Sequence, residues 1–410
     1  MRSASRVTRA AKSCCKTPVD RANAVTISTV ADIEPFRIAI SDAELNDLRR
    51  RLRDTRWPEA ETVKDWSQGV PLAYLHDLVA YWAEDYDWRA REARLNRFPQ
   101  CRVSVGGLRI HTYHARSAHA HARPLLMTHG WPGSVVEFLN VIEPLTTPEA
   151  HGGDARDAFH VICPSIPGYG FSDKPSVHGC GVERIAELWD ELMLKLGYTS
   201  YLAQGGDWGA SITTNIGTQN RGHCRGIHLN MPVVRPPDNA ALNPTPAALK
   251  AFALMKHYAE KEAGYSTQQS TRPQTLGYGL VDSPVAQCAW IIEKFWSWTD
   301  CNGLPEKAVG RDELLDNVMM YWLPRAGASS ARLYWESFGA SFGAQQPPVT
   351  LPTGCSLFAK ELMQPPRAWA AKRYTNLVYW NDVPRGGHFA AFEQPQLFVE
   401  ELRRCFALMR

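Results

Sequence analysis

The feature that most constrains the fold is the alternation of short apolar segments with helix-length segments from residue 100 to 232. Gly106 and Gly107 join two extended segments, which is typical of a tight turn between antiparallel strands. The later runs "PLLMTHG", "HVICPSIPG", "SYLAQGG" and "RGIHLNMP" are mostly separated by segments such as "GVERIAELWDELMLKLG". This alternation predicts an α/β fold with a mostly parallel sheet and helices on both faces. Ligands of such sheets bind beyond the carboxyl ends of the strands.

The flanking segments differ in character. The first residues carry five basic side chains and no acid before Asp20, so we expect a disordered extension or a start assigned too far upstream, with a transit peptide as the alternative. From Ser41, "SDAELNDLRRRLRDTRWP" has a capping serine and helically spaced leucines. The expected parts are a disordered extension (1–30), an all-helical N-terminal region (31–99), the first half of the sheet (100–232), an inserted helical lid (233–345) and the second half of the sheet (346–410).

Composition excludes several classes of function. Lys and Arg total 45 against 42 for Asp and Glu, so the net charge of +3 gives no reason to expect nucleic acid or an anionic membrane as partner. The 10 cysteines contain no CxxC pair or zinc-type spacing, which argues against a disulfide framework and a metal site. No apolar run is long enough for a transmembrane segment. We expect a soluble, cytoplasmic protein with no cofactor or metal, acting on a small substrate; monomer and homodimer remain open.

The stretch "GGDWGA" places Asp207 where a strand turns sharply into a helix. It has the form G-x-D-x-G, and in the serine version of this turn small residues flank an exposed nucleophile. A carboxylate needs no base to activate it and can displace a leaving group at saturated carbon. Epoxides and alkyl halides are suitable electrophiles. The alternative is an acid that only caps a helix.

Two further segments support the catalytic interpretation. "LLMTHGWPGSVVEF" places Trp131 between a strand and a helix, and in the α/β-hydrolase architecture a backbone N–H from this loop joins that of the residue after the nucleophile. Trp131 and Trp208 are therefore the expected oxyanion donors. In "VPRGGHFAAFEQP", His388 follows the last apparent strand, as the chain order nucleophile, acid, histidine requires. We expect Glu361 to orient it, with Asp382 as the competing acid.

At this point the chain resembles a known family. From about Ile33 to the end it resembles the microsomal-type epoxide hydrolases, which have an α/β-hydrolase fold with an N-terminal helical extension. The matching stretches include "RLRDTRWP", "HGWPGSVVEF", "IPGYGFSDKP", "GGDWGA", "HLNMP", "EKFWSWTD" and "GGHFAAFEQP". The resemblance implies that Asp207 is the nucleophile, Glu361 the charge-relay acid and His388 the base. It also implies two lid tyrosines that donate to the epoxide oxygen, and these fall at Tyr265 and Tyr334.

The sequence thus predicts an enzyme that converts apolar epoxides to vicinal diols through an aspartyl ester. Trp290, Phe295 and Trp296 of the aromatic lid are the expected substrate contacts. A haloalkane dehalogenase is the first alternative, since that related family uses the same ester chemistry, often with a tryptophan after the nucleophile. Tyr265 and Tyr334 argue against it because a halide needs no phenolic donor. A catalytically silent binding protein with a hydrolase fold is the second alternative.

Overall fold

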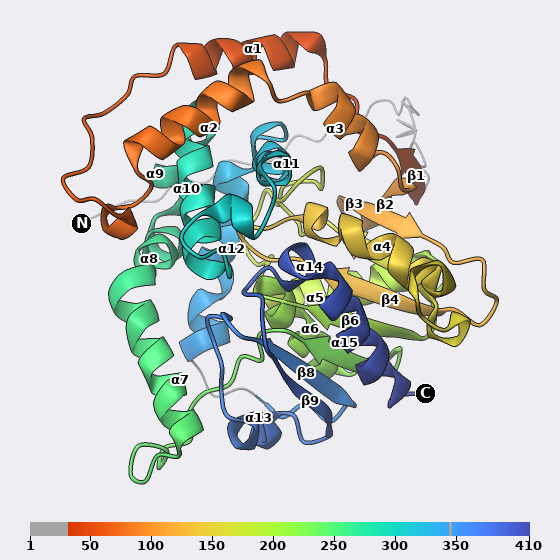
Figure 1. Cartoon of the computed structure of the whole chain (residues 1–410). Helices are drawn as coiled ribbons and strands as arrows, with labels where there is room; N and C mark the ends of the chain where they lie inside the picture. The colour runs from red at the N-terminus through yellow and green to blue at the C-terminus, as the bar shows by residue number, and fades with distance from the viewer. Residues whose placement is uncertain (1–31, 344–346) are drawn as a thin grey trace, which may run out of the picture. The chain divides into compact units, whose positions relative to one another are not determined.

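The computed structural model describes residues 32–343 and 347–410, and the predicted disordered extension lies outside them. In these residues one nine-stranded sheet forms the centre, with strand order β1-β2-β3-β5-β4-β6-β7-β8-β9 (Figure 1). The strands are β1 (Ile33–Phe36), β2 (Gln100–Val105), β3 (Leu108–Ala115), β4 (Arg123–Thr128), β5 (Phe159–Pro164), β6 (Tyr201–Gly205), β7 (Cys224–Leu229), β8 (Thr353–Phe358) and β9 (Leu377–Val383).

The sheet is parallel from β5 to β9 and antiparallel in its first part. Antiparallel pairing joins β1 to β2, β2 to β3 and β3 to β5. Strands β5, β4, β6, β7, β8 and β9 then pair in parallel. This confirms the predicted fold class. It corrects the expectation of an all-helical N-terminal region, because β1 pairs with β2 through residues such as Glu34 and Arg102. Pro35 obscured this strand in the sequence, and it is tolerated because β1 lies at the edge of the sheet.

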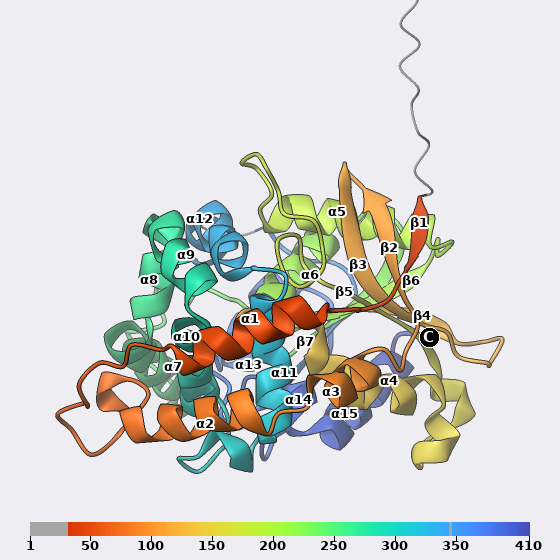
Figure 2. The ribbon, with the colours of Figure 1, turned by 90° about the horizontal axis from the view of Figure 1, so that it is seen from above.

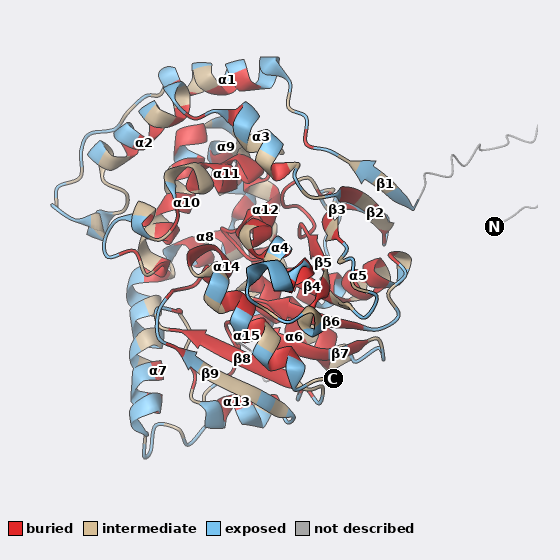
Figure 3. Ribbon diagram, turned by 45° about the vertical axis from the view of Figure 1, so that its right-hand side comes forward, coloured by how far each residue is buried: buried red, intermediate tan, exposed pale blue. Residues whose placement is uncertain are grey.

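Helices cover both faces of the sheet. Helices α5 (Val182–Lys195) and α6 (Trp208–Gln219) contact each other and one face, while α4 (Leu139–Thr146) and α15 (Pro395–Ala407) contact each other and the opposite face. Burial follows this layering, since the central strands are buried and the outer faces of the helices are exposed (Figure 3). The sheet is therefore the core of the molecule. Two short helices, α13 (Arg367–Arg373) and α14 (Ala390–Glu393), belong to its second half.

The segment between β7 and β8 forms the predicted lid. Its helices are α7 (Pro246–His257), α8 (Gly264–Thr271), α9 (Pro273–Asp282), α10 (Pro284–Trp298), α11 (Arg311–Trp322) and α12 (Gly327–Gly343), with a π-helical turn at Tyr258–Glu262 between α7 and α8. Helix α12 contacts both α8 and α9, and α10 contacts α9 and α11. Helices α8 to α12 thus pack against one another, and α7 contacts the π-helical turn that follows it.

The N-terminal helices lie along the lid. They are α1 (Asp42–Arg53), α2 (Leu72–Glu84) and α3 (Trp88–Leu95). Ser41 caps α1 by accepting from the backbone N–H of Glu44, and Leu45, Leu48 and Leu52 are buried, as the sequence predicted. Helix α1 contacts α10, and seen from above it crosses the lid helices (Figure 2). The N-terminal region therefore covers the lid.

Candidate active site

Asp207 occupies a strained turn between β6 and α6. Its backbone has φ 50° and ψ −126°, a conformation uncommon for any residue other than glycine. Such strain persists only where the surrounding structure holds it, and it is concentrated at functional sites. The turn presents the carboxylate beyond the carboxyl end of a central strand.

The glycines around Asp207 are required by close contacts. A Cβ on Gly205 would lie 2.1 Å from the carbonyl oxygen of Gly209, and a Cβ on Gly209 would lie 1.9 Å from that of Thr128. A Cβ on Gly130 would lie 2.3 Å from the Cβ of Asp207. A side chain at each position would clash with backbone or with Asp207 itself. The G-x-D-x-G pattern is thus a packing requirement of the turn.

The loop after β4 supplies a hydrogen-bond donor to the carboxylate of Asp207. The backbone N–H of Trp131 donates to Oδ1 of Asp207 at 2.8 Å. Trp208 is the first residue of α6, and the first N–H groups of a helix have no acceptor within the helix. The structure therefore brings the Trp131 donor onto the carboxylate and leaves the Trp208 N–H at the N-terminus of α6 beside it.

His388 lies between two carboxylates. Its Nδ1 is 2.7 Å from Oε1 of Glu361, and its Nε2 is 3.3 Å from Oδ2 of Asp207. Glu361 and His388 are both buried. The competing acid, Asp382, lies exposed near the end of β9. Of the two candidate acids, the structure brings Glu361 to the histidine.

The charges around His388 outweigh its burial. Burial by itself lowers the pKa of a histidine, but the neighbouring Glu361 and Asp207 carboxylates raise the pKa of His388 well above its ordinary value. The two carboxylates thus favour the protonated form of His388. Anything that removes the charge of Asp207 also removes part of what holds that proton.

Glu393 fixes the loop that carries His388, and sequence reasoning missed it. Its carboxylate accepts hydrogen bonds from the backbone N–H groups of Gly387, Phe389 and Asp300, at 2.9, 3.0 and 2.8 Å. Burial raises the pKa of Glu393 to about 7. The only hint was its position in "GGHFAAFEQP", five residues after the histidine. The residues on both sides of His388 are held by one side chain.

Tyr265 and Tyr334 lie with Asp207 on a cavity of about 870 Å³ between the lid and the sheet. Burial raises the pKa of both phenols well above its ordinary value, with nearby tyrosines and Asp207 adding to the shift. Both phenols are therefore protonated and able to donate. Much of the remaining wall is apolar and includes Met231, Val233, Val234, Phe338, Phe342, Leu362 and Met363.

Aromatic packing places the two tyrosines. The Tyr265 ring stacks on Trp131 with centroids 4.8 Å apart, and the Tyr334 ring meets Trp208 edge-on at 4.8 Å. The hydroxyl of Tyr258 lies 3.1 Å from that of Tyr265. Trp131 and Trp208 thus pack against the rings of the two tyrosines.

The three aromatic residues expected to contact substrate do not line this cavity, which corrects that prediction. Phe295 is fully buried and stacks on Phe389. Trp296 stacks on Trp66, and Trp290 donates to Gln269. Helix α10 therefore uses these side chains to pack within the lid, against the loop after β9 and against the N-terminal region. The spacing of aromatic residues in the sequence did not show which face of α10 lines the cavity and which face packs against other parts of the protein.

Glu137 is a second acid that the sequence did not single out. It lines a cavity of about 20 Å³ together with Asp207, His388 and Trp131, large enough for about one water molecule. Burial raises the pKa of Glu137 to about 8, with Asp207 adding to the shift and His388 opposing it. At neutral pH the carboxyl group is therefore mostly protonated and can donate a hydrogen bond.

We expect this buried acid to give stability a distinct pH dependence. Between its ordinary pKa of 4.5 and about 8, the folded protein keeps a proton that the unfolded chain releases, so stability falls as pH rises through that window. Glu137→Gln should lack this contribution. From pH 5 to 8 the wild type should lose on the order of 1–4 kcal/mol more than the variant in denaturant unfolding. The exposed control Glu400→Gln should follow the wild type; equal pH dependence in all three proteins would contradict the protonated state.

Within 32–343 and 347–410, no group of three or more His, Cys, Asp or Glu side chains is arranged to hold a metal ion. No helix in that part of the chain is long and apolar enough to cross a membrane. The cysteines of the same part are free thiols, all buried except the half-buried Cys180.

Comparisons with known proteins agree with this geometry. Residues 33–138 match the family model described as epoxide hydrolase N terminus, and residues 123–274 match that of the alpha/beta hydrolase fold. A protein of Stigmatella aurantiaca (strain DW4/3-1), named provisionally as an epoxide hydrolase, is 54% identical over 92% of this chain and 86% of its own length. Epoxide hydrolase 1 of Oryctolagus cuniculus is 36% identical over 92% of this chain and 89% of its own.

A solved structure agrees as well. The juvenile hormone epoxide hydrolase of the silkworm Bombyx mori superposes with a TM-score of 0.84 at 32% identity, covering 92% of this chain and 95% of that one. With relatives this similar over almost the whole chain, and with the α/β-hydrolase fold in place, the chain belongs to the epoxide hydrolase family.

Proposed function

We propose that this enzyme hydrolyses apolar epoxides to vicinal diols through a covalent ester at Asp207. The observation that carries the proposal is that a carboxylate on a strained turn and two protonated phenols, Tyr265 and Tyr334, line one cavity. A nucleophile and acids for the leaving oxygen are the groups that ring opening requires. The membership of the epoxide hydrolase family supports the same reaction.

In the first step, Oδ2 of Asp207 attacks a ring carbon. Oδ1 is held by the Trp131 N–H, which leaves Oδ2 as the attacking oxygen. A C–O bond to the enzyme forms as the ring C–O bond breaks, and the electron pair of that bond goes to the ring oxygen. Tyr265 or Tyr334 donates the proton that the oxygen needs. The product is a hydroxyalkyl ester of Asp207.

Ester formation prepares the second step. The neutral ester removes one of the two charges that hold the proton on His388, so the pKa of His388 falls and the imidazole becomes a base. His388 gives its proton to the tyrosinate left by the first step, which restores the tyrosine. The neutral imidazole then takes a proton from the attacking water. Glu361 stabilises the imidazolium that forms. Water adds to the ester carbonyl, and the oxyanion forms at Oδ1 against the Trp131 N–H. Collapse breaks the ester C–O bond to the substrate, and the departing oxygen takes the proton of the new carboxyl group. The diol leaves, with Asp207 again a carboxylate and His388 again protonated.

Glu137 has a position suited to the attacking water. It shares a cavity the size of one water with His388 and Asp207, and Asp207 also lines the substrate cavity. A neutral carboxyl group there can hold a water without competing for the proton of His388. We assign Glu137 the positioning of that water.

The substrate test separates epoxide hydrolysis from the dehalogenase alternative. Styrene oxide and 2-phenylethyl bromide present similar carbon frames but need different leaving-group assistance. We expect phenylethanediol from the first and no bromide from the second, measured side by side by chromatography and halide titration. Bromide release without diol formation would assign the site to dehalogenation. The apolar wall of the cavity supports a bulky aryl or aliphatic epoxide.

Location and assembly remain predictions. A cytoplasmic enzyme fits the even charge balance and the scattered thiols. The oligomeric state is either a monomer or a homodimer, and sedimentation analysis distinguishes the two.

A further inference from the structure

The loop after β4 is held on both sides of its catalytic N–H. We call residues 130–133 the oxyanion loop. The backbone N–H of Ile166 donates to Nε2 of His129, so His129 Nδ1 carries the ring proton and donates to the carbonyl oxygen of Gly130 at 2.9 Å. That carbonyl and the Trp131 N–H belong to the same peptide plane. Fixing the carbonyl therefore fixes the direction of the N–H that donates to Asp207.

The other two anchors come from lid helix α11. Asn317 donates from Nδ2 to the carbonyl oxygen of Pro132 at 2.8 Å, and the hydroxyl of Tyr321 donates to that of Gly133 at 2.6 Å. Both side chains are buried, and their spacing of four residues puts them on one face of the helix. The place of α11 therefore sets the place of the oxyanion loop.

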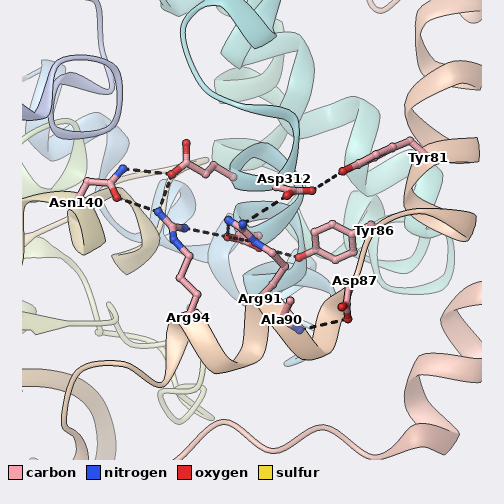
Figure 4. Close-up of polar contacts among 10 residues, drawn as sticks. Tyr81, Tyr86, Asp87, Ala90, Arg91, Arg94, Asn140 and Asp312 are labelled. Atoms are coloured by element: carbon pink, nitrogen blue, oxygen red, sulfur yellow. Dashed lines mark hydrogen bonds and ion pairs between the residues drawn. The ribbon is translucent and has the colours of Figure 1, made fainter.

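Helix α11 is held in turn by the N-terminal region. Asp316, next to Asn317 in the chain, is fully buried and accepts hydrogen bonds from Nε of Arg91 at 2.9 Å and from the hydroxyl of Tyr86 at 2.8 Å. Arg94 lies 3.2 Å from the same carboxylate. Figure 4 shows both arginines extending from α3 toward α11, where Asp312 also lies.

Further polar contacts join the N-terminal helices to α11. Arg94 also pairs with Glu313 at 2.7 Å and donates to Asn140 at 2.9 Å. Tyr81 of α2 donates to Asp312 at 2.6 Å. Asp312, Glu313 and Asp316 thus give α11 an acidic side that the N-terminal arginines neutralise. The same helix presents Asn317 and Tyr321 to the oxyanion loop.

We propose that the N-terminal helices act as a positioning element of the active site, through the chain of contacts Arg91 and Tyr86, Asp316, then Asn317 and Tyr321, then the oxyanion loop. The inference rests on the proposed ester mechanism. A purely structural junction would stabilise the fold but would not favour one chemical step over the other.

The two chemical steps place different demands on the Trp131 N–H. When Asp207 attacks, its carboxylate loses charge, so a weaker hydrogen bond to Oδ1 does not slow the attack. When water adds to the ester, Oδ1 gains a negative charge, and a misplaced donor raises the barrier. Loosening the oxyanion loop should therefore slow ester hydrolysis selectively and cause the alkyl-enzyme to accumulate.

Three variants that each lose one buried hydroxyl test this. Tyr321→Phe removes an anchor of the loop, and Tyr86→Phe removes a donor to Asp316. Tyr201→Phe is the matched control, because its hydroxyl donates to the buried Asp190 at 2.9 Å, at the end of β6 remote from Asp207. Rapid-quench mass analysis with styrene oxide gives the rates of ester formation and decay, and thermal unfolding gives the stability of each variant.

We expect Tyr321→Phe to slow ester decay about 10-fold, less than the roughly 10²–10³-fold lost when an oxyanion donor itself is removed, with ester formation changed by less than about 2-fold. Tyr86→Phe should also slow ester decay more than ester formation, but by a smaller factor than Tyr321→Phe. Tyr201→Phe should change neither rate even though it loses stability. Asn317→Ala, which removes the second anchor, should repeat the effect of Tyr321→Phe.

The outcomes separate the inference from the proposed function. The positioning role would be overturned if Tyr321→Phe and Asn317→Ala slowed ester formation and ester decay by the same factor. It would also be overturned if neither variant changed the ratio of these two rates. Selective slowing in Tyr321→Phe with a Tyr86→Phe variant identical to the control would overturn the contribution of the N-terminal helices. Absence of any alkyl-enzyme in the wild type and in every variant would instead contradict the ester mechanism.

Discussion

The His388→Gln variant is expected to form the alkyl-enzyme and then stop. Asp207 attacks without help from a base, so ester formation should survive. Ester hydrolysis, in contrast, loses the group that takes a proton from water. Glutamine keeps a polar side chain of similar length but has no basic nitrogen. Steady-state turnover of styrene oxide should fall by at least about 10³-fold.

Intact-protein mass spectrometry measures this prediction directly. One equivalent of adduct should appear on His388→Gln within the time of a wild-type turnover, and peptide mapping should place it on Asp207. His119→Gln, which alters a histidine paired with the surface acid Glu149, is the control and should turn over normally. A variant with neither adduct nor burst would show that His388 is needed before the ester forms, and the order of steps proposed above would be wrong.

Replacing Tyr265 and Tyr334 together by phenylalanine should nearly abolish ring opening. Both phenols stay protonated because burial raises their pKa, and without them the ring oxygen must leave as an alkoxide in a largely apolar cavity. Loss of general acid assistance is worth about 10²–10⁴-fold, and we expect the upper part of that range for the double variant. Each single variant keeps one donor and should retain more activity.

The readout for the tyrosines is the rate of ester formation, since ester decay does not use the phenols as acids. Tyr278→Phe, at an exposed lid position, is the control and should behave as the wild type. Ester formation at the wild-type rate in the double variant would remove both tyrosines from the mechanism. An equal loss in the control would point to damage of the lid.

The site residues that stand in sequence motifs could be predicted from the sequence. Those whose role depends on tertiary packing could not. Asp207 stands out because a sharp turn demands glycines at fixed spacing, which the contacts of Gly205 and Gly209 explain. Chain order led to His388 and favoured Glu361, and the structure places His388 between Asp207 and Glu361. Tyr265 and Tyr334 came only from the family resemblance, because nothing in the lid's periodicity distinguishes them from packing aromatics.

What the sequence missed depends on long-range contacts. Glu137 and Glu393 look like ordinary helix acids until burial and their neighbours are known. Phe295 and Trp296 were expected on the cavity, yet α10 turns them toward the core and the N-terminal region. The role of Asp316 depends on two arginines more than 200 residues away in the chain.

The central claim is that Asp207 becomes covalently attached to the substrate, and a single turnover in oxygen-18 water tests it most directly. With enzyme in excess over styrene oxide, water attacks the ester carbonyl, so the label should appear in the peptide that holds Asp207 and the diol should remain unlabelled. Label found in the diol, with an unlabelled Asp207 peptide, would mean that water opens the epoxide directly and would contradict the account.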